Sequence, residues 1–99
     1  MAEVIVTGGE KVWPVSVEEV LAEHPGISEV AVWKRADPEW GERVVAWVVV
    51  PPGVAPPALE ALRDLVAGRL APWSAPRELV MVDRLPRTAG GKVRRSELV

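Results

Sequence analysis

A short basic segment close to the C-terminus holds the residues best suited to chemistry. It contains Lys92, which directly follows Gly90 and Gly91. Glycine most readily takes positive φ and lets backbone approach a ligand closely. Arg87 and Thr88 add a guanidinium and a hydroxyl, so the segment is suited to a phosphate or a carboxylate. The competing interpretation from composition alone is a solvated, mobile tail, because chain ends are commonly poorly ordered.

This segment does not fit the common phosphate-binding loops. A Walker-type loop needs a glycine six residues before its lysine and a Ser or Thr after it, and those positions hold Pro86 and Val93. A dinucleotide-binding loop needs three spaced glycines, which neither glycine pair, 8–9 or 90–91, supplies. One histidine and no cysteine cannot form a Ser-His-Asp or Cys-His set. The chain is therefore expected to contribute one charged group to a site and not a complete set of catalytic residues.

Composition limits the function further. The 99 residues, 48% of them hydrophobic, predict a single domain over residues 1–99. The absence of cysteine and the single His24 predict no metal site within the chain. Residues 77–99 carry 6 basic and 3 acidic side chains, whereas residues 1–76 carry 6 and 11. Because the positive charge is local, a small anionic ligand is favoured and nucleic acid is not an expected partner.

The hydrophobic runs are short. The longest, Val44 to Val50, is much too short to cross a bilayer, and the N-terminus has no basic segment followed by an apolar stretch. These features predict a protein without a membrane partner, located in the cytoplasm.

The elements that must position these residues follow from the hydrophobic pattern. A hairpin is expected around Gly8 and Gly9, and strands over residues 27–35, 43–50 and 78–83. Helices are expected over 16–24 and 57–70, the first opened by a capping box of Ser16 and Glu19 and ended near His24. The predicted fold is α+β: a small, mostly antiparallel three-stranded sheet with two helices packed on it, plus the N-terminal hairpin.

Two loops between these elements carry tryptophan. Trp40 lies beside Gly41 in the loop between the first two strands, where it could act as a stacking surface or cover a nearby core. Trp73 and Arg77 lie in a proline-bounded loop after the second helix.

Taken in order, these motifs resemble one family. They are Gly8-Gly9-Glu10-Lys11-Val12-Trp13-Pro14, Val17-Glu18-Glu19-Val20-Leu21, His24-Pro25, Asp37-Pro38-Glu39-Trp40-Gly41-Glu42, Ala75-Pro76-Arg77, Leu85-Pro86-Arg87-Thr88 and Gly90-Gly91-Lys92-Val93. The ordered set closely resembles the small C-terminal domain of adenylate-forming enzymes: acyl-CoA synthetases, adenylation domains of peptide synthetases and firefly-type luciferases. The resemblance covers nearly the whole chain and is strongest to acyl-CoA synthetases.

The resemblance implies a two-step AMP-forming ligase that joins a carboxylic acid to CoA. A large N-terminal domain would bind ATP, Mg²⁺ and the acid, and this small domain would swing between two poses over it. In the first pose Lys92 would contact the carboxylate and the α-phosphate during adenylate formation. Arg87, Thr88, Gly90 and Gly91 would support the loop that delivers it.

In the second pose the resemblance places other residues at the active site. Gly8 and Gly9 would line the tunnel through which the pantetheine arm reaches the adenylate. In some CoA ligases of the family, residues at the positions of Trp40, Trp73 and Arg77 hold the CoA nucleotide. The chain departs from such relatives at Ser74 and Ala75, where lysine or arginine is frequent, so its contacts to CoA through Trp73 and Arg77 would be weaker or built differently.

The resemblance leaves alternatives open. The chain lacks the ATP-binding domain and the hinge before the glycine loop, so it is expected to be an excised domain or a separate partner, inactive by itself and with an exposed, poorly ordered lysine loop. The acceptor could be a carrier protein in place of CoA. From a different class, the chain could be a non-enzymatic binding module with a basic tail.

Overall fold

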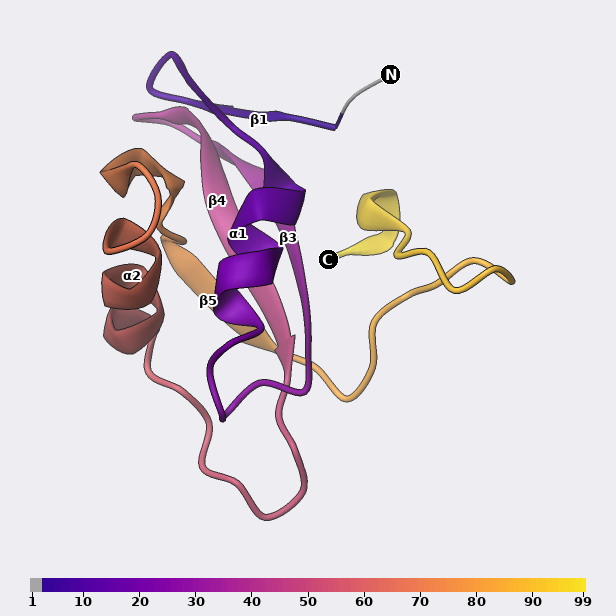
Figure 1. Cartoon of the computed structure of the whole chain (residues 1–99). Coiled ribbons are helices and arrows are strands. Elements are labelled where there is room, and N and C mark those ends of the chain that lie inside the picture. The colour runs from indigo at the N-terminus through magenta and orange to yellow at the C-terminus, as the bar shows by residue number, and fades with distance from the viewer. Residues whose placement is uncertain (1–2) are drawn as a thin grey trace.

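The computed structural model describes residues 3–99, and its sheet is built around one central strand (Figure 1). β4 (Gly41–Val49) pairs antiparallel with β3 (Glu29–Asp37) along its whole length. On its other side it pairs in parallel with β5 (Glu78–Met81) and, at Gly41, antiparallel with β1 (Ile5–Thr7). β2 (Glu10–Val12) completes the hairpin with β1.

The α+β class predicted from the sequence is confirmed, with one extension. The N-terminal hairpin is part of the main sheet, which therefore has five strands in place of three. Each predicted strand lies within two residues of the observed one, and β4 is shielded on both faces, as expected of a strand that is apolar throughout.

The first helix begins earlier than its capping box predicts. α1 covers Pro14–Leu21, with Trp13 at the N-cap and no side-chain cap, so the Ser16–Glu19 box is wrong. Proline at the first helical position is preorganised by its fixed φ and lacks an N–H, so the helix can begin there with one unsatisfied donor fewer. The helix also ends before His24, whose Nδ1 accepts a hydrogen bond from the N–H of Gly26 at 2.9 Å.

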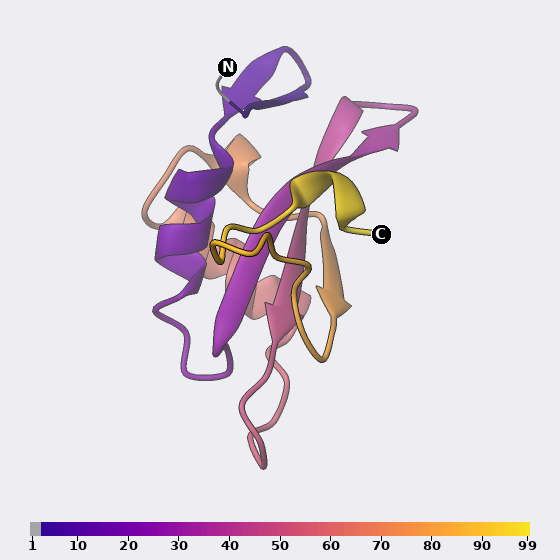
Figure 2. The ribbon, with the colours of Figure 1, turned by 90° about the vertical axis from the view of Figure 1, so that its right-hand side faces the viewer.

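The second helix is shorter than predicted, and different elements cover the two faces of the sheet. α2 spans Leu59–Ala67 and packs with α1 over one face, around Val44, Ala46 and Val48. The opposite face is covered by the C-terminal segment after β5, whose Leu85 and Leu98 pack on the other side chains of β4, including the fully buried Trp47. Figure 2 shows this segment crossing in front of the strands with α2 behind them.

The segments that carry the candidate residues leave this framework in different directions. The β1–β2 turn, the β3–β4 turn and the short 3₁₀ helix η1 (Pro72–Ser74) lie together at the upper left of Figure 1. The loop that contains Lys92 extends to the right, just before the second 3₁₀ helix, η2 (Arg95–Glu97). Within residues 3–99, none of the helices is long and apolar enough to cross a membrane.

Candidate functional site

Lys92 lies on a hydrogen-bonded turn. Arg87 and Val93 form an antiparallel bridge at its base, and the N–H of Thr88 donates to the carbonyl of Lys92 at 2.7 Å. The Thr88 side chain closes the turn, because its Oγ1 accepts the N–H of Lys92 at 3.1 Å. Gly91, with φ of +89°, has the positive φ that such a turn needs.

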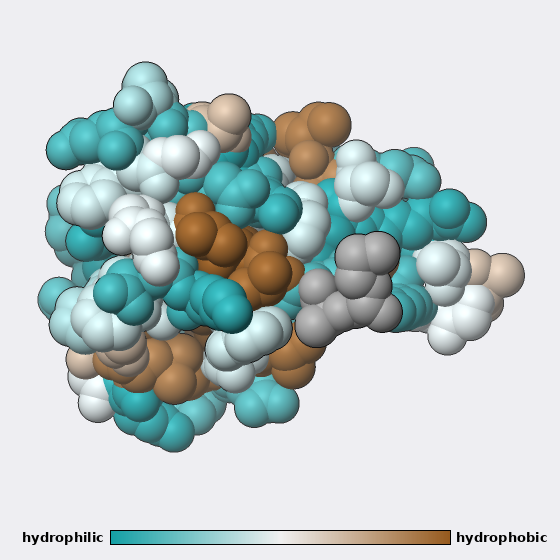
Figure 3. Space-filling model, turned by 90° about the horizontal axis from the view of Figure 1, so that it is seen from above, coloured by the Kyte–Doolittle hydropathy of each residue, from teal (hydrophilic) through white to brown (hydrophobic). Residues whose placement is uncertain are grey.

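The turn stands away from the body of the protein. In Figure 3 it forms the mainly hydrophilic projection at the right of the molecule. Lys92 is exposed and, within residues 3–99, its ammonium takes part in no ion pair. Gly90 is also exposed and has no close neighbour that would exclude a side chain. The predicted exposure of the loop is confirmed, and its backbone forms a regular turn.

Two arginines tie the ends of this turn to the fold. Before the turn, Arg87 pairs with Glu29 at 2.5 Å and donates to the carbonyl of Gly91 at 2.8 Å. After it, Arg95 is only 9% exposed and pairs with Glu18 of α1. Burial acts to lower the pKa of Arg95, but hydrogen bonds to Glu18 and Glu3 outweigh it and the pKa is raised.

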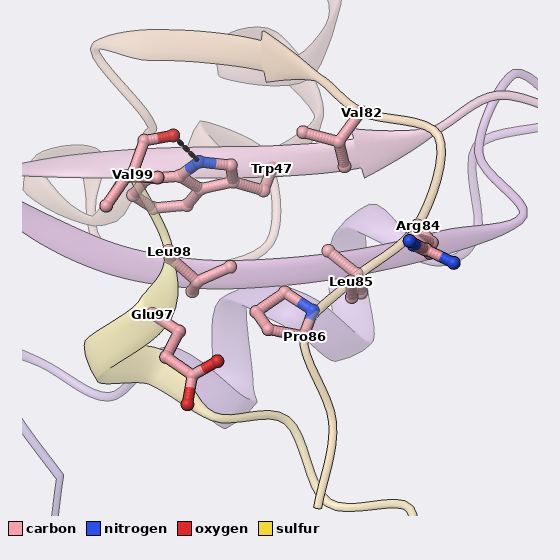
Figure 4. A pocket seen from close by; sticks show the side chains of 8 residues that line it. All are labelled: Trp47, Val82, Arg84, Leu85, Pro86, Glu97, Leu98 and Val99. Carbon is pink, nitrogen blue, oxygen red and sulfur yellow. Dashed lines mark hydrogen bonds between the residues drawn. The ribbon is translucent and has the colours of Figure 1, made fainter.

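A small pocket lies under the C-terminal segment, close to the base of the turn. It has a volume of about 270 Å³ and is mainly apolar. Figure 4 shows Trp47, Leu85 and Leu98 around its interior, with Arg84 and Glu97 at separate edges. The indole N–H of Trp47 donates to the carbonyl of Val99 at 3.2 Å, which fixes the C-terminal segment over the sheet.

The second candidate surface is centred on Trp40, and an aspartate shapes its turn. Oδ1 of Asp37 accepts the backbone N–H groups of Glu39 at 2.8 Å and Trp40 at 2.9 Å. These two N–H groups, with smaller contributions from Arg43 and Arg77, hold the pKa of Asp37 below its ordinary value. Asp37 therefore stays ionised and fixes the Trp40 backbone.

Gly8 and Arg77 meet at the Trp40 ring. The N–H of Gly8 donates to the Trp40 carbonyl at 2.9 Å, and a Cβ at Gly8 would lie 2.8 Å from the indole. The guanidinium of Arg77 lies 4.3 Å from the ring centroid, a cation–π contact. The structure thus brings together three residues that the family resemblance assigned to the second pose: Gly8, Trp40 and Arg77. We call them the Trp40 cluster.

The other residues of this surface have a looser relation to the ring. Gly9 is exposed with nothing within 4 Å of an added Cβ. Trp73 lies in η1, 45% exposed, on the same end of the molecule. Ser74 and Ala75 are buried, and Ala75 belongs to the core on the helical side of the sheet. The exposed side chains of this segment that could contact a ligand through a ring or a charge are therefore Trp73 and Arg77.

Sequence reasoning named Arg87 and Thr88 as supports of the Lys92 loop but missed three other supporting residues, Asp37, Glu18 and Arg95. An Asp-Pro turn signal at Asp37 was available and indicates a side chain that bonds the following N–H groups. Arg95 and Glu18 gave no comparable signal, because they are 77 positions apart. Across residues 3–99, no three His, Cys, Asp or Glu side chains come together to hold a metal ion.

Comparison with known proteins gives the family. Residues 16–92 match the family described as the AMP-binding enzyme C-terminal domain. The chain belongs to this family. It is 50% identical over 97 residues to a probable 2-succinylbenzoate–CoA ligase of Mycobacterium tuberculosis, covering 98% of this chain and 25% of the relative. It is 47% identical over 96 residues to an indoleacetate–CoA ligase of Aromatoleum aromaticum, covering 97% of this chain and 19% of the relative.

A solved structure shares the fold. The amide bond synthetase McbA of Marinactinospora thermotolerans superimposes with a TM-score of 0.91 at 36% identity, covering 98% of this chain and 19% of that protein. The chain thus spans between about a fifth and a quarter of the length of these relatives. The family resemblance predicted from the sequence motifs, to the C-terminal domain of adenylate-forming enzymes, is confirmed.

Proposed function

We propose that this chain serves as the C-terminal domain of an AMP-forming acid–CoA ligase, with one surface for each half-reaction. The observation that carries the proposal is the separation of Lys92, on an exposed turn, from the Trp40 cluster at another side of the same domain. Both relatives named above are CoA ligases. The rest of the enzyme, including the ATP site and any Mg²⁺, would belong to an N-terminal partner domain, and a cytoplasmic location stays a prediction.

In the first half-reaction a carboxylate oxygen attacks the α-phosphorus of ATP, and diphosphate leaves. Negative charge increases around the α-phosphate in the transition state, where the Lys92 ammonium would stabilise it. At about 4 Å and an effective dielectric constant near 20, such a pair is worth on the order of 4 kcal/mol, or roughly a thousandfold in rate. Lys92 is free to make this contact because its ammonium has no partner within residues 3–99.

In the second half-reaction the CoA sulfur attacks the acyl carbonyl, and AMP leaves. Trp40 offers a ring for the adenine, and exposed Arg77 beside it offers a cation for phosphate. Gly8 packs against one part of the ring, and because it has no side chain it does not displace the ring. The domain would rotate between the two half-reactions, since Lys92 and the Trp40 cluster lie on different sides.

The acceptor of the acyl group has one chemical alternative. McbA is named as an amide bond synthetase, so chains with this fold are not confined to CoA ligases. A carrier protein is the alternative acceptor, in which case Trp40 and Trp73 would contact protein and not nucleotide. Saturation of the second half-reaction by free CoA favours the CoA ligase; turnover only with a carrier protein favours the alternative.

The test of the proposal is Lys92→Ala in the assembled ligase, this chain together with its ATP-binding domain. The rate of adenylate formation should fall about a thousandfold. It is measured as the acid-dependent exchange of labelled diphosphate into ATP. Thioester formation from supplied acyl-adenylate should stay near the unaltered rate. Lys11→Ala, which removes an exposed lysine of β2, is the control and should leave both steps unchanged. Equal loss of both half-reactions in Lys92→Ala would contradict the proposal.

A further inference from the structure

The two ends of the Lys92 turn are held by ion pairs of different kinds. Before the turn, Arg87 and Glu29 form a pair in which both side chains are at least 40% exposed. After the turn, the side chain of Arg95 is 9% exposed and that of Glu18 18%. Exposed pairs contribute little and are screened by salt, whereas removing one partner of a buried pair leaves the other charge uncompensated and is costly.

The buried pair is part of a closed hydrogen-bond arrangement. Glu18 accepts the N–H of Val32 at 2.7 Å, and Arg95 donates to the carbonyl of Val32 at 2.8 Å. Arg95 also donates to both carboxylate oxygens of Glu18 and, through Nε, to Glu3 at 2.9 Å. All three guanidinium nitrogens are engaged, so the planar group has one orientation relative to α1 and β3.

Lys92 is only three residues from this fixed point. The N–H of Arg94 donates to the carbonyl of Pro86 at 2.9 Å. This bond holds the segment that leaves the turn against the segment that enters it, next to Arg95. A displacement at Arg95 is therefore transmitted along a short, hydrogen-bonded segment to Lys92. Between Arg95 and the tip, Val93 is partly buried against the core under the C-terminal segment, and the tip itself, residues 89–92, is exposed.

We infer that Glu18 and Arg95 are positioning residues, which hold the turn so that the Lys92 ammonium reaches its place in the active site. The inference rests on the proposed function of Lys92. A misplacement of about 1 Å can cost on the order of a hundredfold in rate. Loss of the pair should therefore impair adenylation and spare thioester formation, which would use the Trp40 cluster.

Conservative variants in the assembled ligase test this inference. Arg95→Lys keeps the charge and removes the planar fork, and Glu18→Gln keeps an acceptor for Val32 and removes the charge. The matched control is Arg69→Lys, because Arg69 makes a bidentate ion pair with Glu23 that does not contact the turn. Thermal unfolding and amide hydrogen exchange of residues 88–93 accompany both half-reactions, and Lys92→Ala is measured beside them.

The expected result is a loss of about a hundredfold in adenylation for Arg95→Lys and Glu18→Gln, with faster exchange in the turn. Thioester formation, and both steps in Arg69→Lys, should be unchanged. Adenylation at the unaltered rate, or an equal loss in both steps that follows a lowered melting temperature, overturns the inference. If Lys92→Ala impairs adenylation and the pair variants do not, only this inference fails; if Lys92→Ala has no effect, the proposed function fails.

Discussion

The Trp40 cluster and the Lys92 turn are built in opposite ways. Trp40 is held by tertiary contacts from two separate segments, with Gly8 against its ring and Arg77 over it, while Asp37 of its own turn accepts its backbone N–H. Lys92 is held by bonds within its own turn and by arginines at its base. A nucleotide-binding surface benefits from being preformed, whereas a group that must enter another domain's active site has to project from its own.

Crowding the Trp40 cluster is expected to have the largest effect. Gly8 has φ of +57° and Gly9 has φ of +82°, so alanine is strained at both, but only at Gly8 does its Cβ meet the indole. Gly9→Ala should cost about 1 kcal/mol of unfolding free energy. Gly8→Ala should cost about 2–4 kcal/mol, because the close contact with Trp40 adds to the strain.

Thermal unfolding of the chain, followed by circular dichroism, measures both glycine variants. The expected additional fall in melting temperature for Gly8→Ala over Gly9→Ala is on the order of 5–15 °C for a domain of this size. Equal melting temperatures would show that Trp40 does not pack against Gly8 in solution.

Removing the Trp40 ring is expected to affect CoA binding and to leave adenylation unchanged. Trp40→Ala should weaken CoA binding by about ten- to a hundredfold, which corresponds to the stacking of one base on an aromatic side chain. Adenylation should be unaffected, because Lys92 lies on another side of the domain. The control is Trp13→Ala, which removes an exposed indole at the start of α1. A normal Michaelis constant for CoA in Trp40→Ala argues against stacking.

A smaller effect is expected within the Lys92 turn. Thr88→Ala removes the acceptor for the Lys92 N–H and should cost about 1 kcal/mol, or roughly fivefold in adenylation rate. Thr88→Ser keeps the hydroxyl and should retain most of the rate. The adenylation rates of the two variants are compared by diphosphate exchange. Equal rates for alanine and serine would show that the Thr88 hydroxyl does not affect adenylation.

The smallest expected effect is a pH dependence confined to the Trp40 turn. The pKa of Asp37 is lowered in the fold, so its stabilising contribution is present above its ordinary pKa and is lost as pH falls below about 4. The indole N–H resonance of Trp40 should shift in that range. In Asp37→Asn, which keeps an acceptor but does not titrate, the shift should disappear, and its persistence would point to another acid.

Features that depend on neighbouring residues could be predicted from the sequence, whereas contacts between distant segments could not. The strands follow from local hydrophobic runs, and Lys92 and Trp40 from motifs within a few residues. The capping box predicted at Ser16 is wrong because Pro14 begins the helix two residues earlier. The Glu18–Arg95 pair left no signal, because only the folding of the C-terminal segment across the sheet brings the two together.

The covering of the sheet's second face was also beyond the sequence pattern. Trp47 lies in the apolar run Val44 to Val50, but nothing in that run indicated that the chain after β5 would cover it. Leu85 and Leu98, which do so, are isolated apolar residues in a basic segment and have no periodicity. Isolated hydrophobic residues can complete a core when the chain returns to it.

The contact between Val32 and the Glu18–Arg95 pair has a further consequence, for solubility. β3 forms one edge of the sheet, and an edge strand presents free N–H and C=O groups to which another chain can add. At Val32 both groups are already bonded to charged side chains. A strand from a second molecule cannot pair there without displacing a buried ion pair, so the same contact protects the edge of the sheet against aggregation.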